Sequence, residues 1–132
     1  MAPKVATQAS RWIGLFFVLI GLLGFAANPI IGPSAAIEAD MGQNIAHLAI
    51  GAYLFGISFM GEGAAAFTLY IAASICLFFA ALAYQELGSY SRGMLWNTLW
   101  ANRAGCYFHG CMALVLALFG KMNTASKQLF YS

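Results

Sequence analysis

The stretch that decides the fold is AAAFTLYIAASICLFFAALAYQ, which occupies positions 64–85 and contains no charged side chain. An α-helix rises about 1.5 Å per residue, so about 20 apolar residues cross the roughly 30 Å hydrocarbon core of a bilayer. This run is long enough to do so, and it is rich in alanine, leucine and phenylalanine. It therefore predicts a transmembrane helix.

The composition of the whole chain also indicates a membrane protein. Of its 132 residues, 62% are hydrophobic and 8% are charged, whereas about 25% of the residues in soluble proteins are charged. The net charge of +2 comes from six basic and four acidic side chains, too few and too scattered for a nucleic-acid surface. We expect a lipid bilayer around the chain and no nucleic acid as a partner.

Charged residues divide the chain into four uncharged intervals, at 12–37, 41–61, 63–85 and 104–120. With the breakers Asn28-Pro29 and the turn Gly61-Glu62-Gly63, these intervals predict helices over residues 12–27, 43–60, 64–85 and 104–120. The turn is so short that the second and third helices are expected to pair as an antiparallel hairpin. The predicted fold class is all-α: a polytopic membrane protein, a single membrane domain over 1–132 built as a bundle of four transmembrane helices.

Residues 87–103, between the third and fourth predicted helices, differ in character from the spans. They contain Arg92, Asn97 and Asn102, and they place Trp96 and Trp100 one helical turn apart. Indole rings prefer the headgroup region of a membrane. The segment is therefore predicted to be partly helical and to lie along the membrane surface.

The positive charges predict the orientation. Four spans place both termini on one side with four basic residues, namely Lys4, Arg11, Lys121 and Lys127, against Arg92 and Arg103 on the other. Because lysine and arginine are enriched on the cytoplasmic side, both termini are expected in the cytoplasm. If residues 43–60 were a re-entrant segment, three spans would also divide the charges four to two. We favour four spans because unpaired backbone is costly in lipid.

The predicted location is a bacterial cytoplasmic membrane, either inner or photosynthetic. No arginine-rich and serine-rich transit peptide precedes the first predicted span, as one would in a precursor imported into an organelle. An organelle-encoded or an already processed chain is the alternative.

Small residues recur on one face of three predicted helices. The sets are Ala66, Ala73 and Ala80; Gly14 and Gly21; and Gly105, Ala113 and Ala117. In lipid, helices associate where small side chains let their backbones approach each other. These faces are therefore predicted to pack inside the bundle.

Two histidines, His47 and His109, are the candidate functional residues of the predicted spans. Ionisable side chains are costly within a membrane and are usually functional there. Asn44 and Gly51 share a helical face with His47, and Gly105 shares one with His109.

The histidines have two interpretations. Each imidazole can make a hydrogen bond across the bundle, worth about 1 kcal/mol. Alternatively, one or both ligate the metal of a tetrapyrrole, which would be chlorophyll, bacteriochlorophyll or haem b. The spacing of Gly105 and His109 resembles the small-x-x-x-His pattern of pigment-binding helices in bacterial antenna polypeptides, whereas Gln43 stands at the corresponding place before His47. The predicted cofactor-binding residues are His109, His47 and Gly105, with His109 preferred.

No pattern for catalysis or for a metal site is found along the chain. The three cysteines, Cys76, Cys106 and Cys111, have no C-x-x-C spacing. Glu38 and Asp40 are predicted to lie in a solvated loop, where nothing would perturb them into an acid and a base. We expect no enzyme, no catalytic residue and no metal site.

Two stretches of the first half resemble a known family. Gly21-Leu22-Leu23-Gly24-Phe25 and Asn44-Ile45-Ala46-His47-Leu48-Ala49-Ile50-Gly51 are similar to the G-x-L-G-F and N-x-x-H-L-x-x-G motifs of the DUF4383 type, small four-helix bacterial membrane proteins of unknown function. That family repeats an asparagine-histidine signature at its last helix, which Asn102 and His109 match loosely. The resemblance implies four spans and related positions for His47 and His109 in a two-hairpin duplication. It implies no activity.

The sequence favours a non-enzymatic accessory or structural subunit of a larger integral membrane complex. A chain with short loops and several small-residue faces offers helix surface to lipid and to other membrane protein subunits. The alternative is a tetrapyrrole-binding subunit of a photosynthetic or respiratory complex, with histidine as the axial ligand.

Overall fold

The structure is a computed structural model that describes residues 4–95 and 99–130, with side chains up to residue 122. Its helices are α1 (Val5–Leu23), α2 (Met41–Ile57), α3 (Glu62–Leu87) and α4 (Arg103–Phe130). Its strands are β1 (Ile31–Gly32), β2 (Ile37–Glu38), β3 (Arg92–Leu95) and β4 (Leu99–Asn102). The described chain is mostly helical, and each strand pair lies in the connection between two helices.

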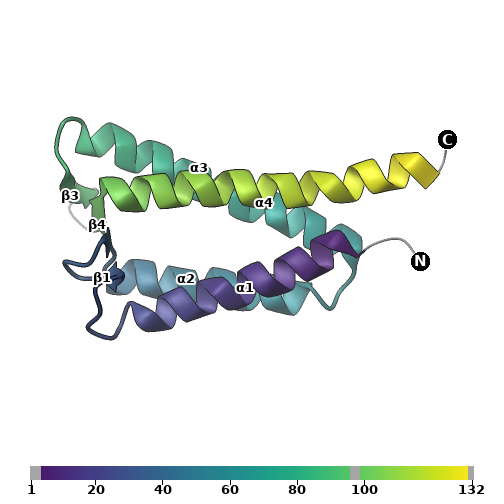
Figure 1. Cartoon of the computed structure of the whole chain (residues 1–132), viewed down its shortest axis with the longest axis horizontal. Helices are drawn as coiled ribbons and strands as arrows, with labels where there is room; N and C mark the ends of the chain where they lie inside the picture. Colours follow the sequence, from purple (N-terminus) through teal and green to yellow (C-terminus); the bar gives the residue numbers. More distant parts are fainter. Residues whose placement is uncertain (1–3, 96–98, 131–132) are drawn as a thin grey trace.

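The helices form two helical hairpins, which Figure 1 shows one above the other. In the first hairpin α1 packs mainly against α2, and in the second hairpin α3 packs mainly against α4. Both connections that contain strands lie at one end of the bundle, and we call this the strand end (Figure 1). Both termini and the α2–α3 turn lie at the opposite end.

The predicted pairing of the second and third helices is wrong. A short turn does join α2 to α3, but each of these helices packs mainly on another partner. The reason is the glycine contact between α1 and α2. A Cβ built on Gly51 would lie 2.7 Å from the backbone oxygen of Gly14 and 2.7 Å from the backbone nitrogen of Val18. The two backbones therefore touch, as they do at glycine contacts between membrane helices.

Alanine takes the corresponding role in the second hairpin. Ala66, Ala73 and Ala80 of α3 are all buried, as is Ala113 of α4. The prediction that the small-residue faces pack inside the bundle is confirmed for these residues.

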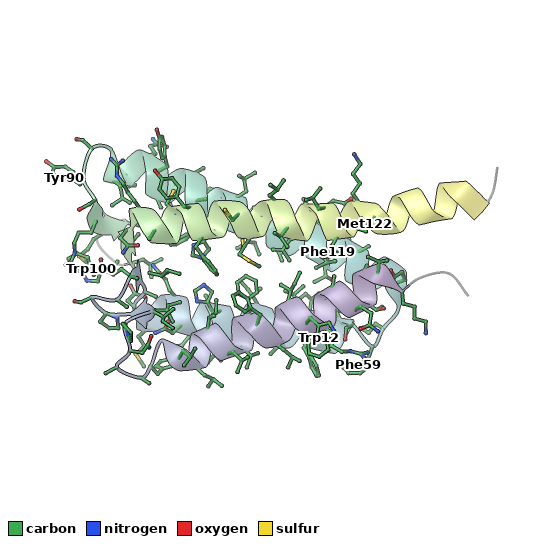
Figure 2. The ribbon with its side chains drawn as sticks, viewed as in Figure 1. Trp12, Phe59, Tyr90, Trp100, Phe119 and Met122 are labelled. Carbon is green, nitrogen blue, oxygen red and sulfur yellow. The ribbon has the colours of Figure 1, made fainter. Side chains whose placement is uncertain are left out.

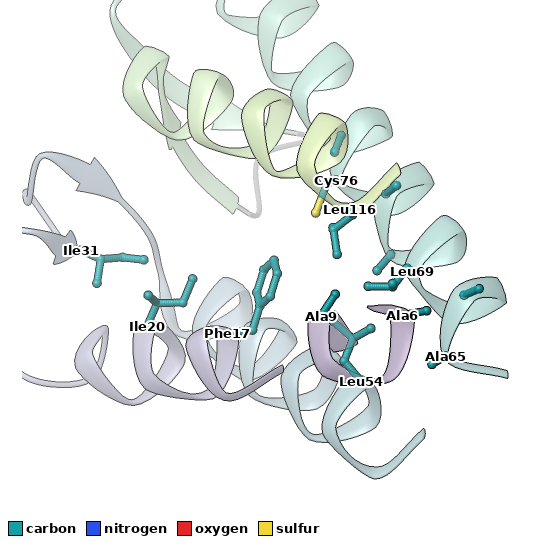
Figure 3. Close-up of a cluster of buried hydrophobic side chains, with 14 of the residues drawn as sticks. Ala6, Ala9, Phe17, Ile20, Ile31, Leu54, Ala65, Leu69, Cys76 and Leu116 are labelled. Atoms are coloured by element: carbon teal, nitrogen blue, oxygen red, sulfur yellow. The ribbon is translucent and has the colours of Figure 1, made fainter. Parts of the chain in front are cut away.

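The two hairpins share one apolar core. Each helix contributes a fully buried large side chain to it: Phe17 from α1, Leu54 from α2, Leu69 from α3 and Leu116 from α4 (Figure 3). Transfer of such a side chain from water into a protein core contributes about 1.5–3 kcal/mol. Lipid tails are as apolar as the core, so within a bilayer the stability has to come from close packing of the helices.

Among the described residues, three helical segments are long and apolar enough to cross a membrane: Val5–Leu23, Glu62–Leu87 and Arg103–Met122. Helix α2 is shorter, with 17 residues. The outer surface of the bundle carries many exposed large apolar side chains, among them Trp12, Phe59 and Met122 (Figure 2). These features are compatible with an integral membrane protein.

The helix ends differ from their predicted positions. Helix α1 begins at Val5 rather than near residue 12, and α4 extends to Phe130 rather than ending near residue 120. Lys121 and Lys127 therefore belong to α4, beyond the predicted end of the fourth helix. The apolar pattern marks the part of a helix that suits lipid, whereas backbone hydrogen bonding continues into polar residues beyond it.

Residues 88–95 and 99–102, the described part of this connection, form no helix, contrary to the prediction of a partly helical segment over 87–103. β3 and β4 pair antiparallel, with Arg92 opposite Asn102 and Leu95 opposite Leu99. Leu95 and Ala101 are buried while their neighbours along each strand are more exposed, in the alternation of a strand. Trp96 and Asn97 lie outside the described residues.

Candidate functional site

The two histidines predicted as site residues meet between the hairpins. His47 comes from α2 and His109 from α4, 62 positions apart in the sequence, and their Nε2 atoms lie 3.4 Å apart. Both side chains are buried, with exposed fractions of 4% and 7%. The structure thus joins the two predicted residues in one site, which we call the histidine pair.

The rings point at each other through their Nε2 corners. The ring planes differ by 15°, but the ring centroids are 5.5 Å apart, clearly farther than the two nitrogens. The rings are therefore arranged end to end and not face to face. Whatever binds both imidazoles has to lie between the two corners.

A backbone carbonyl orients His109. Its Nδ1 lies 2.7 Å from the carbonyl oxygen of Gly105, one turn earlier in α4. A carbonyl only accepts, so Nδ1 carries the hydrogen, and the Nε2 of the neutral ring presents a free lone pair to His47. The Nδ1 of His47 is buried without a hydrogen-bond partner among the described residues.

Aromatic rings hold the pair from three helices. Phe17 of α1 has its ring centroid 5.7 Å from that of His47, and Phe79 of α3 lies 4.5 Å from His109. The Phe108 ring stands edge-on to His109 at 5.3 Å. These contacts fix the imidazole planes and surround them with apolar atoms.

A cavity of about 180 Å³ adjoins the histidine pair. Both imidazoles line it, together with mostly apolar residues that include Ala46, Ile50, Ile75, Cys76 and Phe79. The site can therefore hold a small molecule or ion beside the histidines, but its walls offer few polar contacts.

At the strand end, hydrogen bonds join β4 to the start of α2 beside the cavity of the histidine pair. The Nε2 of Gln43 donates a hydrogen bond to the backbone oxygen of Trp100 at 2.5 Å, and the backbone nitrogen of Trp100 donates to Asp40 at 2.9 Å. The other Asp40 oxygen accepts from the backbone nitrogen of Gln43 at 2.9 Å and caps α2. Strand β4 is thereby tied to the start of α2.

Glu38 does not lie in a solvated loop as predicted. Its side chain is 6% exposed and forms an ion pair of 2.8 Å with Arg92 of β3. The Arg92 guanidinium also lies 5.2 Å from the ring centroid of Trp100. Local sequence shows two scattered charges here, and only the packing of the two hairpins brings them together.

Gly105, one of the predicted cofactor-binding residues, has close neighbours from outside α4. A Cβ built on Gly105 would lie 3.4 Å from Asn102 Oδ1, 3.8 Å from the Glu38 carbonyl oxygen and 3.9 Å from Ile37 Cγ2. The connection between α1 and α2 fills this space. Gly105 therefore acts through its carbonyl group, which orients His109.

A tetrapyrrole ring does not fit between the two imidazoles as the chain folds. Two metal–nitrogen bonds of about 2.0 Å in a straight line would separate the Nε2 atoms by about 4 Å, more than the 3.4 Å found here. The cavity of about 180 Å³ is also smaller than the roughly 300–1,000 Å³ of usual ligand pockets.

The two stretches that resemble the DUF4383 type lie against each other in the first hairpin. A Cβ built on Gly21 would lie 2.9 Å from the Asn44 carbonyl oxygen, and one built on Gly24 would overlap the Asn44 side chain. The motif glycines therefore serve the contact between α1 and α2. His47, which belongs to the same motif, reaches across to the second hairpin instead.

Fold and site together define a helical bundle with three candidate membrane spans and a buried histidine pair between two hairpins. No family model, no curated protein and no solved structure matches the chain. The resemblance to the DUF4383 type stays a prediction.

Proposed function

We propose that the chain is a four-span membrane protein that acts as a non-enzymatic accessory subunit of a larger membrane complex. The observation that carries this proposal is a groove of about 360 Å³ on the second hairpin. Small residues of α3 and α4 line most of it: Ala73, Ser74, Gly110, Ala113 and Ala117. Helix association in lipid depends on close packing at such residues, so the groove suits a transmembrane helix of another subunit.

The place of α2 beside α1 supports the proposal of four spans. Gly51 of α2 lies on Gly14 of α1, and Leu48 lies near Gly21, so the two helices remain in contact over several turns. The 17 residues of α2 rise about 25 Å, at the short end of the range for spans. With four spans both termini share one side, and the excess of basic residues near them favours the cytoplasm of a bacterium.

Gly110 is the position that tests the groove. No described atom outside its own helix backbone lies within 4 Å of a Cβ built there. Gly110→Leu should therefore fill the groove without a clash inside the chain. Gly56→Leu is the matched control, since Gly56 lies on α2 and is equally free of neighbours.

The experiment is native electrophoresis of membranes dissolved in a mild detergent, followed by mass spectrometry of cross-linked partners. We expect the wild-type chain of 14.1 kDa to migrate with one set of partners in constant ratio, and Gly110→Leu to release it. Gly56→Leu should leave the complex intact. A wild-type chain that migrates alone, or a complex that Gly110→Leu leaves unchanged, would contradict the proposal.

A further inference from the structure

We propose that His47 and His109 bind a transition-metal ion with a filled d shell, Cu⁺ or Zn²⁺, through their Nε2 atoms. The remaining coordination positions would face the adjoining cavity. This site goes beyond the accessory role and does not depend on it.

The distance between the nitrogens carries the proposal. Bonds from imidazole nitrogen to such an ion measure about 2.0–2.1 Å. Two of these bonds that span the 3.4 Å between the Nε2 atoms enclose an angle of about 110° at the metal, close to the tetrahedral angle of four-coordinate Zn²⁺. Cu⁺ would take this angle only with further ligands from the cavity. The arrangement of the rings brings both Nε2 corners to the same place between the hairpins.

The partner of His109 is the kind that metal-binding histidines have. A ligating imidazole usually donates its other N–H to a carbonyl or a carboxylate, which fixes the ring and its tautomer. The Gly105 carbonyl does this for His109. The ligand is therefore oriented before any ion arrives.

A direct hydrogen bond between the imidazoles is the competing explanation. The 3.4 Å between Nε2 atoms is longer than the usual 2.7–3.2 Å for hydrogen bonds to nitrogen donors. The Nδ1 of His47 has no partner among the described residues in either case: it carries a lone pair if Nε2 donates to His109, and the hydrogen if Nε2 binds the ion. The distance between the Nε2 atoms therefore favours a bound ion over a direct hydrogen bond.

The chain itself supplies two ligands. No group of three or more His, Cys, Asp or Glu side chains in the described part of the chain is placed to hold a metal. A small molecule or anion in the cavity of about 180 Å³ would complete the coordination. Because apolar surroundings penalise net charge, Cu⁺ suits the two neutral imidazoles better than Zn²⁺ without an accompanying anion.

The test uses the full chain in detergent, purified through a streptavidin-binding tag so that no polyhistidine is present. After treatment with a chelator, the protein is titrated with Cu⁺, Zn²⁺ and Co²⁺, and bound metal is counted by mass spectrometry. We expect one Cu⁺ or Zn²⁺ per chain and the strong visible absorption of tetrahedral Co²⁺. Each of His47→Phe and His109→Phe should lower the affinity at least tenfold.

Cys111→Ser is the matched control, because this cysteine is exposed and offers an accidental metal ligand. It should bind metal like the wild type. X-ray absorption of the loaded wild-type chain counts imidazole ligands without any variant, and it should find two. Failure of the wild type to bind one ion, unchanged binding in both histidine variants, or a metal without imidazole ligands would overturn the proposal. None of these results tests the groove between α3 and α4 on which the proposed accessory role depends.

Discussion

At Gly51 the backbone of α2 rests directly on α1, so we expect this position to tolerate no side chain. Gly51→Ala should destabilise the protein by about 1–3 kcal/mol, the usual cost of overpacking, because the added Cβ meets backbone atoms at 2.7 Å. The change in the free energy of unfolding is measured by equilibrium unfolding in mixed detergent micelles. Gly56→Ala should instead be neutral or stabilising by up to about 1 kcal/mol, since alanine favours a helix and no described neighbour is close. Equal stability of the two variants would contradict the glycine contact.

The ion pair between Glu38 and Arg92 should respond unequally to the loss of each partner. The Arg92 side chain is 54% exposed and the Glu38 side chain 6%. Arg92→Gln leaves a buried carboxylate without its counter-ion, which costs about 3 kcal/mol. Glu38→Gln should cost less, because the amide oxygen still accepts a hydrogen bond and water reaches Arg92. The same unfolding assay compares the two variants, and an equal loss of stability in both would mean that Glu38 is not buried.

Both histidines could be recognised in the sequence as costly residues within apolar stretches, but their meeting could not. They are 62 positions apart, and no local pattern relates them. Only the resemblance to the DUF4383 type implied related positions for them, and in the structure each is the seventh residue of its helix, α2 or α4. Equal positions in two similar hairpins meet when the hairpins pack against each other.

Among the elements, the connection between α3 and α4 tests membrane depth. Trp100 on β4 is 39% exposed at the strand end, and Trp12 on α1 is 66% exposed toward the end with the termini (Figure 2). Variants that keep one of these tryptophans, with Trp96 replaced by Phe, should be quenched by lipids brominated near the headgroup. Quenching of Trp100 by deeply brominated lipids alone would place this connection inside the hydrocarbon layer.

The same connection shows what local sequence leaves open. Trp96 and Trp100 have the spacing of one helical turn, which favoured a helix in the prediction. A strand depends on its partner, however, and the pairing of Arg92 with Asn102 involves residues on both sides of the loop. The long apolar runs, by contrast, predicted α1 to α4 because helical hydrogen bonds are local. Apolar character did not predict where these helices end.

At the scale of the whole molecule, both termini should lie on the same side of the membrane. In a chain with its native cysteines replaced by alanine, Lys4→Cys and Lys121→Cys mark the end with the termini, and Ser89→Cys marks the strand end. In intact cells a reagent that cannot cross the membrane should label position 89 and neither of the others. Labelling of positions 4 and 121 from opposite sides would require three spans.

The separate packing of each hairpin also has a consequence for assembly during synthesis. Each half of the chain contains its own helix-to-helix contact, glycine in one half and alanine in the other. Residues 1–60 and 61–132, translated as two polypeptides in one cell, should therefore each insert as a unit and then find each other. A tag on one half should recover the other in equal amount. Recovery of the tagged half alone would mean that the covalent turn is needed to bring the halves into register.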